Sequence, residues 1–151
     1  MKLLDKSFKN ENLTIKNSNI FFKNLDNEVL FINKVLKLKY YYEQKELRNI
    51  FYLDSEIFNI PFTMETFFNK DKNKVFSKIN LKSMKLQIEN ELTFENEKKI
   101  GKSEFILNKL KRNAEYQINK NSTNFRIFDR IDQPDIIYKG NFNFKPFYGN
   151  L

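Results

Sequence analysis

Alternation of apolar and polar residues between Met84 and Glu95 constrains the fold more than any other feature of this chain. Apolar residues hold the even positions of this segment and polar or charged residues hold the odd ones, with Asn90 as the single interruption. Successive side chains of a β-strand point to opposite faces of a sheet, so the pattern predicts a strand with one apolar and one polar face. At about 3.3 Å per residue such a strand extends roughly 40 Å, which predicts a long ribbon.

The same two-residue period recurs elsewhere, which predicts an all-β fold for the whole chain. The 17 Phe and 7 Tyr residues favour sheets, whereas alanine, the best helix former, occurs only as Ala114. A short helix or a frayed arm is expected only at Met1–Lys9. Further alternating runs cover residues 36–42, 62–68, 114–118 and 136–144.

Short polar breaks separate the alternating runs, at residues 24–27, 43–45, 69–74, 96–102, 120–123 and 132–135. Short connections join neighbouring antiparallel strands, so we expect one domain over residues 1–151 that forms a long antiparallel meander. No segment offers a helix to cover the apolar faces, so the sheet must close on itself, form a sandwich or stay open around something apolar. We expect a curved, twisted open groove, a half-barrel, because three glycines are few for the corners of a closed barrel.

Two missing residue types exclude several kinds of active site: the chain contains no His and no Cys. Imidazole acid–base catalysis, thiolate nucleophiles, disulfides and zinc sites built from His and Cys all need these side chains. A glycine-rich phosphate loop is also excluded, because the only glycines are Gly101, Gly140 and Gly149. We therefore expect a protein that is not an enzyme and that uses no cofactor and no metal.

Two groups of carboxylates remain as candidates for chemistry. Glu89, Glu91 and Glu95 occupy odd positions of one strand, on its polar side. We interpret them as the solvated face of that strand and not as an acid–base pair. Three aspartates lie between residues 129 and 135, around Pro134, without the Gly and the terminal Glu of a calcium loop. Asp and Pro are typical of turns, so we interpret both groups as structural.

The formal net charge of +8 and the isoelectric point near 9.5 are typical of proteins that bind nucleic acid or anionic membrane surfaces. Segment 37–42, with three tyrosines and two lysines, suits stacking on single-stranded nucleic acid, but cross-strand aromatic packing explains it equally well. Arginine, which reads phosphates and base edges bidentately, is scarce. It occurs only at Arg48, Arg112, Arg126 and Arg130.

The chain has no run of about 18 apolar residues, so we expect no transmembrane helix. Residues 1–10 have neither the long apolar region nor the cleavage site of a signal peptide. Near the other end the apolar pattern still runs through Phe144, Pro146, Phe147 and Leu151, which predicts one segment of a longer β array. Unpaired edges of such a segment favour self-association.

Segment Leu13–Ile32, LTIKNSNIFFKNLDNEVLFI, resembles the recurring unit of the AsmA-like family, the group of AsmA, TamB and YhdP. In that unit a strand of the form x-I-x-N-S-x-I-x-F-x-D precedes a partner strand. Residues 56–64, EIFNIPFTM, and 140–147, GNFNFKPF, are similar to strand starts of the family. The chain departs from the family in lacking its amino-terminal membrane helix and in its shorter length. The matching residues of the first unit are Ile15, Asn17, Ser18, Ile20 and Phe22, with a turn at 24–26.

This resemblance implies a long β-groove, apolar inside and polar outside, that conducts phospholipids between the inner and outer membranes of Gram-negative bacteria. It implies a periplasmic location and, in a full-length protein, an inner-membrane anchor in flanking segments.

Our leading interpretation is therefore a non-enzymatic module that binds and transports phospholipids or other apolar ligands. A closed, lipocalin-like barrel that binds a small apolar ligand is the alternative, and a basic β-domain that binds nucleic acid is the second alternative. The expected groove lining consists of residues at the apolar positions of the alternating runs: Leu36, Leu38, Tyr40, Phe62, Met64, Phe68, Met84, Leu86, Ile88, Leu92, Phe94, Tyr116, Ile118, Tyr138, Phe142 and Phe144.

Overall fold

A computed structural model describes residues 12–69, 72–95, 98–144 and 147–150 of the chain, without the side chains of residues 144, 147 and 148. These residues form one antiparallel sheet of eleven strands and one short 3-10 helix, η3. The elements are β1 (Leu13–Lys23), β2 (Val29–Glu43), β3 (Arg48–Ile57), β4 (Ile60–Asn69), β5 (Lys74–Leu81), η3 (Lys82–Met84), β6 (Leu86–Glu95), β7 (Lys98–Leu107), β8 (Leu110–Ile118), β9 (Ser122–Phe128), β10 (Ile137–Phe144) and β11 (Phe147–Asn150).

The sheet is open, and each strand pairs with the strands next to it in sequence, in the order β1 to β11. Strands β1 and β11 are its two edges. This confirms the expected all-β meander that stays open and twisted, and it shows that the closed-barrel alternative is wrong for this chain. The expected helix or arm at Met1–Lys9 lies outside the described residues.

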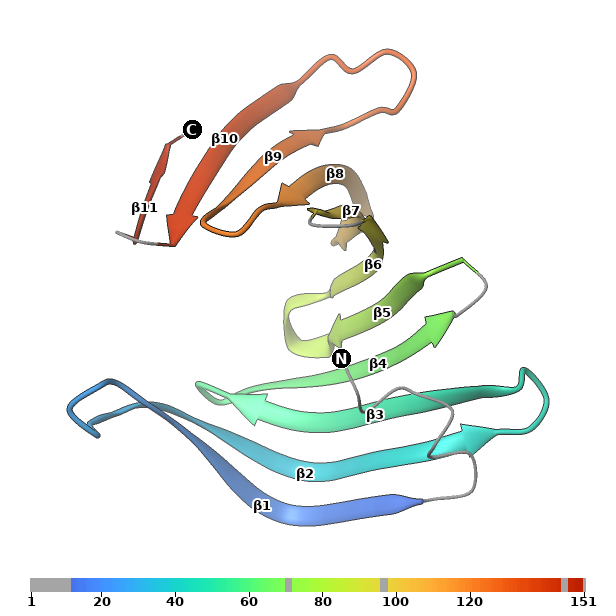
Figure 1. The fold of residues 1–151 in the computed structure, drawn as a ribbon, viewed down its shortest axis with the longest axis vertical. Helices are drawn as coiled ribbons and strands as arrows, with labels where there is room; N and C mark the ends of the chain where they lie inside the picture. The colour runs from blue at the N-terminus through green and yellow to red at the C-terminus, as the bar shows by residue number, and fades with distance from the viewer. Residues whose placement is uncertain (1–11, 70–71, 96–97, 145–146, 151) are drawn as a thin grey trace.

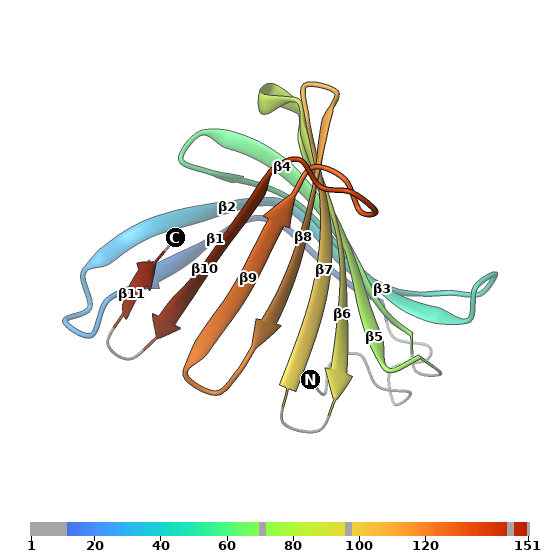
Figure 2. The same cartoon turned by 90° about the horizontal axis from the view of Figure 1, so that it is seen from above.

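Strand twist gives the sheet its shape. β1 to β4 run across the view in Figure 1 while β6 to β8 are seen nearly end-on, and the strands fan out when the molecule is viewed from above in Figure 2. Neighbouring strands are usually rotated by about 20°, so ten successive steps accumulate a rotation on the order of 200°. A sheet twisted to this extent curves without bringing its edges together.

Two hairpins turn through residues with positive φ although they contain no glycine. Phe58 and Asn59 have φ of 53° and 62°, and Asn108 and Lys109 have φ of 47° and 72°. Each pair is the two-residue loop between directly paired strand ends, Ile57 with Ile60 and Leu107 with Leu110. Two successive positive φ values match the twist of the flanking strands and fix the register of each hairpin.

A bulge interrupts the alternation of β1 and β2. Val35 pairs with Ser55 of β3 and Lys37 pairs with Asp54, so Leu36 is an extra residue in β2. Opposite it in β1, Asn17 has a φ of 49°. Beyond the bulge, the side chains that point to a given face change from odd to even positions of β1. Ile15 and Ile20 therefore lie on the same face of the sheet.

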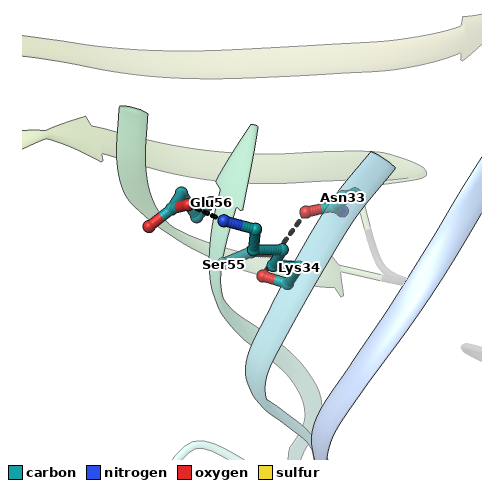
Figure 3. A network of polar contacts seen from close by, with 4 residues as sticks. All are labelled: Asn33, Lys34, Ser55 and Glu56. Atoms are coloured by element: carbon teal, nitrogen blue, oxygen red, sulfur yellow. Dashed lines mark hydrogen bonds and ion pairs between the residues drawn. The ribbon is translucent and has the colours of Figure 1, made fainter. Parts of the chain in front are cut away.

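Two of the most deeply buried residues lie beside this bulge. Val35 is 2% exposed and Ser55 0%. The Ser55 hydroxyl hydrogen-bonds Asn33 Oδ1 and the carbonyl oxygen of Lys34, which satisfies the buried polar groups there (Figure 3). On the other side of the same two strands, Lys34 Nζ lies 2.7 Å from a carboxylate oxygen of Glu56.

The starts of two strands differ from the sequence prediction. β7 begins at Lys98, inside the break expected at 96–102, and β6 begins after Met84. The sequence predicted a strand from Met84 to Glu95, but Met84 lies in η3, where its side chain is 47% exposed. Lys85 follows with a φ of 50°, and its backbone N–H donates to the carbonyl oxygen of Lys82. This tight reversal connects β5 to β6, so the strand can begin only at Leu86.

Candidate functional site

Direct cross-strand partners have their side chains on the same side of the sheet, so the register places every strand residue on one of two faces. We define the apolar face as the face that carries Ile88 of β6. Ile88 pairs with Ile79 of β5 and Phe105 of β7, and these pair in turn with Met64 of β4 and Arg112 of β8. Apolar side chains therefore follow one another across β4 to β7 as well as along each strand, and the charged Arg112 ends this row in β8.

Most of the expected lining residues share this face, two do not fit, and one cannot be placed. Leu36 is the extra residue of the bulge and is 48% exposed, and Val35 occupies the regular position beside it. Met84 lies in η3, and the side chain of Phe144 lies outside the described part of the chain. The residues that the register places on the apolar face are Leu38, Tyr40, Phe62, Met64, Phe68, Leu86, Ile88, Leu92, Phe94, Tyr116, Ile118, Tyr138 and Phe142.

No second layer packs on the apolar face within the described residues. Substantial contacts join only neighbouring strands and η3 with β4 and β6. Large apolar side chains of this face stay open to solvent near its edges and strand ends, among them Ile20 of β1 at 43%, Leu110 of β8 at 63% and Phe142 of β10 at 44%. Between them, Val35, Tyr40, Leu53 and Val75 are buried by neighbouring side chains of the same sheet. Exposed apolar side chains gathered on one face are typical of a site for a lipid, a ligand or another apolar surface.

Asn90 belongs to a polar row that crosses this apolar face. Its direct partners are Ser77 of β5 and Ser103 of β7, and Ser77 in turn pairs with Thr66 of β4. Asn90 Oδ1 accepts hydrogen bonds from the Ser103 hydroxyl at 2.7 Å and from the Tyr116 hydroxyl at 2.6 Å. Burial raises the pKa of Tyr116 above 10.0, against the opposing effect of its hydrogen bond to Asn90, so the phenol stays a donor at neutral pH.

On the polar face, ion pairs occupy Glu89 and Glu91, two of the three glutamates that the sequence singled out, and also Glu115. Glu89 accepts a hydrogen bond from Lys78 Nζ at 2.8 Å, and this bond lowers the pKa of the Glu89 carboxyl. Glu91 pairs with Lys74, and Glu115 lies 2.7 Å from Arg126. A carboxylate that stays ionised beside a lysine is poorly suited to carry a proton in general acid–base catalysis.

The aspartates around Pro134 act in a turn. Asp129 Oδ1 accepts backbone N–H bonds from Asp135 at 3.1 Å and from Ile136 at 3.2 Å. Asp135 also lies 3.5 Å from Arg130. In the described parts of the chain, no cluster of three or more Asp or Glu side chains is placed to hold a metal ion.

A hollow of about 500 Å³ opens on the polar face between β4 and β9. Phe67 and Phe76 stack with ring centroids 5.1 Å apart at one end, and Phe128 and Ile131 lie at the other. Charged side chains such as Lys78 and Glu89 separate the two ends, so the apolar surface of the hollow is not continuous. The alternating pattern did not predict these aromatic residues. Adjacent apolar residues within one strand, such as Phe67-Phe68 and Val75-Phe76, were the signal that both faces carry apolar groups.

None of the helices among the described residues is long and apolar enough to cross a membrane. The comparisons with known proteins returned no match to a family model, to a curated protein or to a solved structure. The geometry of the two faces is therefore the basis for assigning a function.

Proposed function

We propose that this protein is a non-enzymatic module that binds the acyl chains of phospholipids on its apolar face and lets them move along it. The observation that carries the proposal is the apolar face itself, which continues from β1 to β10 and which no described element covers. Apolar side chains left in water are unfavourable, so a ligand that covers them gains free energy.

Hydrophobic transfer supplies a mechanism for this role. Burial of one CH₂ group is worth about 0.8 kcal/mol, so a long acyl chain gains a large free energy wherever the lining is apolar. Neighbouring strands present similar side chains at successive positions, such as Ile79, Ile88 and Phe105. A chain that moves across the strands exchanges one apolar contact for another without returning to water.

The resemblance to AsmA-like proteins supports placing this activity between the inner and outer membranes, with the module anchored at the inner membrane through flanking segments. The open edges at β1 and β11 are compatible with pairing to further strands or to a second copy. The polar face carries partly exposed ion pairs, which interact well with water. A groove that is surrounded by water needs such a surface on its outer side.

Lipid that co-purifies with the protein tests this function directly. The protein is purified without detergent, extracted with organic solvent, and its bound phospholipid is quantified by mass spectrometry. We expect Ile88→Lys to lower the bound lipid sharply, because it places a charge where an acyl chain lies. Gln87→Lys is the matched control, since it introduces the same side chain on the polar face of the same strand.

Far-UV circular dichroism of both variants shows whether they are folded. A folded wild-type protein that carries no lipid, and that extracts none from phospholipid vesicles, would refute the proposed function. Equal loss of lipid in both variants would refute the assignment of binding to the apolar face.

A further inference from the structure

The polar row divides the apolar face instead of ending it. On β6, Asn90 has Ile88 on one side and Leu92 on the other, and all three point to the same face. On β5, Ser77 likewise lies between Ile79 and Val75. A lipid that lies on the apolar face therefore meets polar groups in the middle of its apolar contacts.

The hydrogen bonds inside the row leave one donor unused. The hydroxyls of Ser103 and Tyr116 both donate to Oδ1 of Asn90, so the oxygen of this amide is fully engaged. Among the described residues, the Nδ2 group of Asn90 has no hydrogen-bond partner, and it is not enclosed within the protein. Two hydroxyls from β7 and β8 thus fix the position of the amide oxygen, and the N–H groups lie on the other side of the same planar amide.

A hydrocarbon chain that covered this amide would remove water from Nδ2 and give nothing in return. A buried donor without an acceptor is strongly unfavourable, whereas a ligand that brings a carbonyl oxygen satisfies it. Sites that donate to a ligand atom discriminate against analogues that lack the acceptor for the same reason. The row therefore selects for a ligand with an acceptor next to its apolar chain.

We propose that Asn90 recognises the acyl ester of a lipid, with Nδ2 donating a hydrogen bond to an ester carbonyl oxygen while the acyl chain lies over the flanking apolar residues. This inference rests on the proposed lipid-binding function and adds to it the ligand class, acyl esters as opposed to ether lipids or plain hydrocarbons. Thr66, which donates to Ser77 Oγ at 3.0 Å, continues the polar row toward β4.

A pair of lipids that differ only at the ester tests the proposal. Diacyl phosphatidylcholine and dialkyl phosphatidylcholine of the same chain length have the same head group, but only the first has carbonyl oxygens. We expect the wild-type protein to bind the diacyl lipid about 2- to 10-fold more tightly, the range for one net hydrogen bond. Binding is measured at equilibrium with each purified lipid in turn.

Asn90→Asp is the decisive variant, because it keeps an oxygen that accepts from Ser103 and Tyr116 and removes the Nδ2 donor. We expect the preference for the diacyl lipid to fall to about 1-fold in this variant. Gln87→Glu makes the same amide-to-acid change on the polar face of β6 and should keep the full preference.

The outcomes separate this inference from the function on which it rests. Equal binding of both lipids by the wild-type protein, or an unchanged preference in Asn90→Asp, overturns the role of Asn90 and leaves lipid binding intact. Binding of neither lipid overturns the proposed function itself. The comparison of the two lipids on the wild-type protein needs no variant, so it holds even if Asn90→Asp does not fold.

Discussion

Substitution of Gly101 by alanine tests the packing of the apolar face. Gly101 in β7 is the direct partner of Tyr116 in β8, whose ring lies over the glycine. An added Cβ would come within 1.9 Å of Tyr116 Cζ, whereas ordinary contact begins at 3.4 Å. The ring must therefore move by 3.4 − 1.9 = 1.5 Å. At that displacement the 2.6 Å hydrogen bond from Tyr116 to Asn90 breaks.

The expected effect of Gly101→Ala on stability follows from three contributions. Forcing extra volume into a packed contact typically costs about 1–3 kcal/mol. Loss of the hydrogen bond to Asn90 adds about 0.5–1.5 kcal/mol. Alanine also lowers the entropy of the unfolded chain, which stabilises the protein by about 0.4–1 kcal/mol. We expect a net loss of about 0.5–4 kcal/mol in the free energy of unfolding.

Urea unfolding of four proteins measures this effect: the wild type, Gly101→Ala, Tyr116→Ala and the double variant. In the Tyr116→Ala background the added Cβ meets no ring, so Gly101→Ala should be neutral or stabilising by up to about 1 kcal/mol. The urea dependence of unfolding shows whether each variant still unfolds as the wild type does. Equal destabilisation in both backgrounds would refute the argument that the ring of Tyr116 is what excludes a side chain at position 101.

Three further predictions follow from the two faces and from the charge. Ile88→Asp should lower the free energy of unfolding by about 1–3 kcal/mol, because it places an unpaired charge among apolar side chains, whereas Gln87→Asp should change it by less than about 0.5 kcal/mol; similar urea midpoints for the two variants would contradict this. The hydrogen bond from Lys78 lowers the pKa of Glu89 below its ordinary value of 4.5. The ion pair therefore stabilises the fold fully above pH 4.5, and this stability is lost as the pH falls through the lowered pKa. Urea midpoints measured from pH 6 to pH 2.5 should therefore depend less on pH in Glu89→Gln than in the wild type, and an identical pH dependence would show that this pair does not contribute. Retention on a column of immobilised single-stranded DNA should be weak at 150 mM salt, because arginine is scarce and several basic residues of the polar face, such as Lys74, Lys78 and Arg126, are engaged in ion pairs. Strong retention with a steep salt dependence would favour the nucleic-acid alternative.

The sequence predicted the architecture because alternation is a local property. Each strand carries its own two-residue period, so the run from Leu86 to Glu95 identifies a strand and its two faces without reference to any neighbour. The absence of a covering helix then predicted an open sheet. The boundary at Met84 was wrong because the apolar parity continues into η3, where the backbone no longer alternates.

Features that depend on backbone geometry or on pairing between strands were not predictable from alternation. The bulge at Leu36 changes the parity of β2, so a strict period assigns the wrong residue to the apolar face and overlooks Val35. The two hairpins at residues 58–59 and 108–109 were not expected as breaks, because they have no Asn-Gly or Asp-Gly pair. The polar row around Asn90 exists only because the register brings residues of four strands together, so in a single strand it looked like an interruption.

The sequential strand order of the sheet has a consequence for how the protein loses its structure. Since each strand pairs with its neighbours in the chain, no substantial contact between distant strands of the described chain ties β1 to β11. Unfolding can then proceed hairpin by hairpin from either edge, as in repeat proteins whose stability is a sum over nearest neighbours. Amide hydrogen exchange should be slowest near the deeply buried Ile50 and Ser55 of β3 and faster toward β10. The same locality keeps loop-closure costs low, so the sheet should fold quickly for an all-β protein.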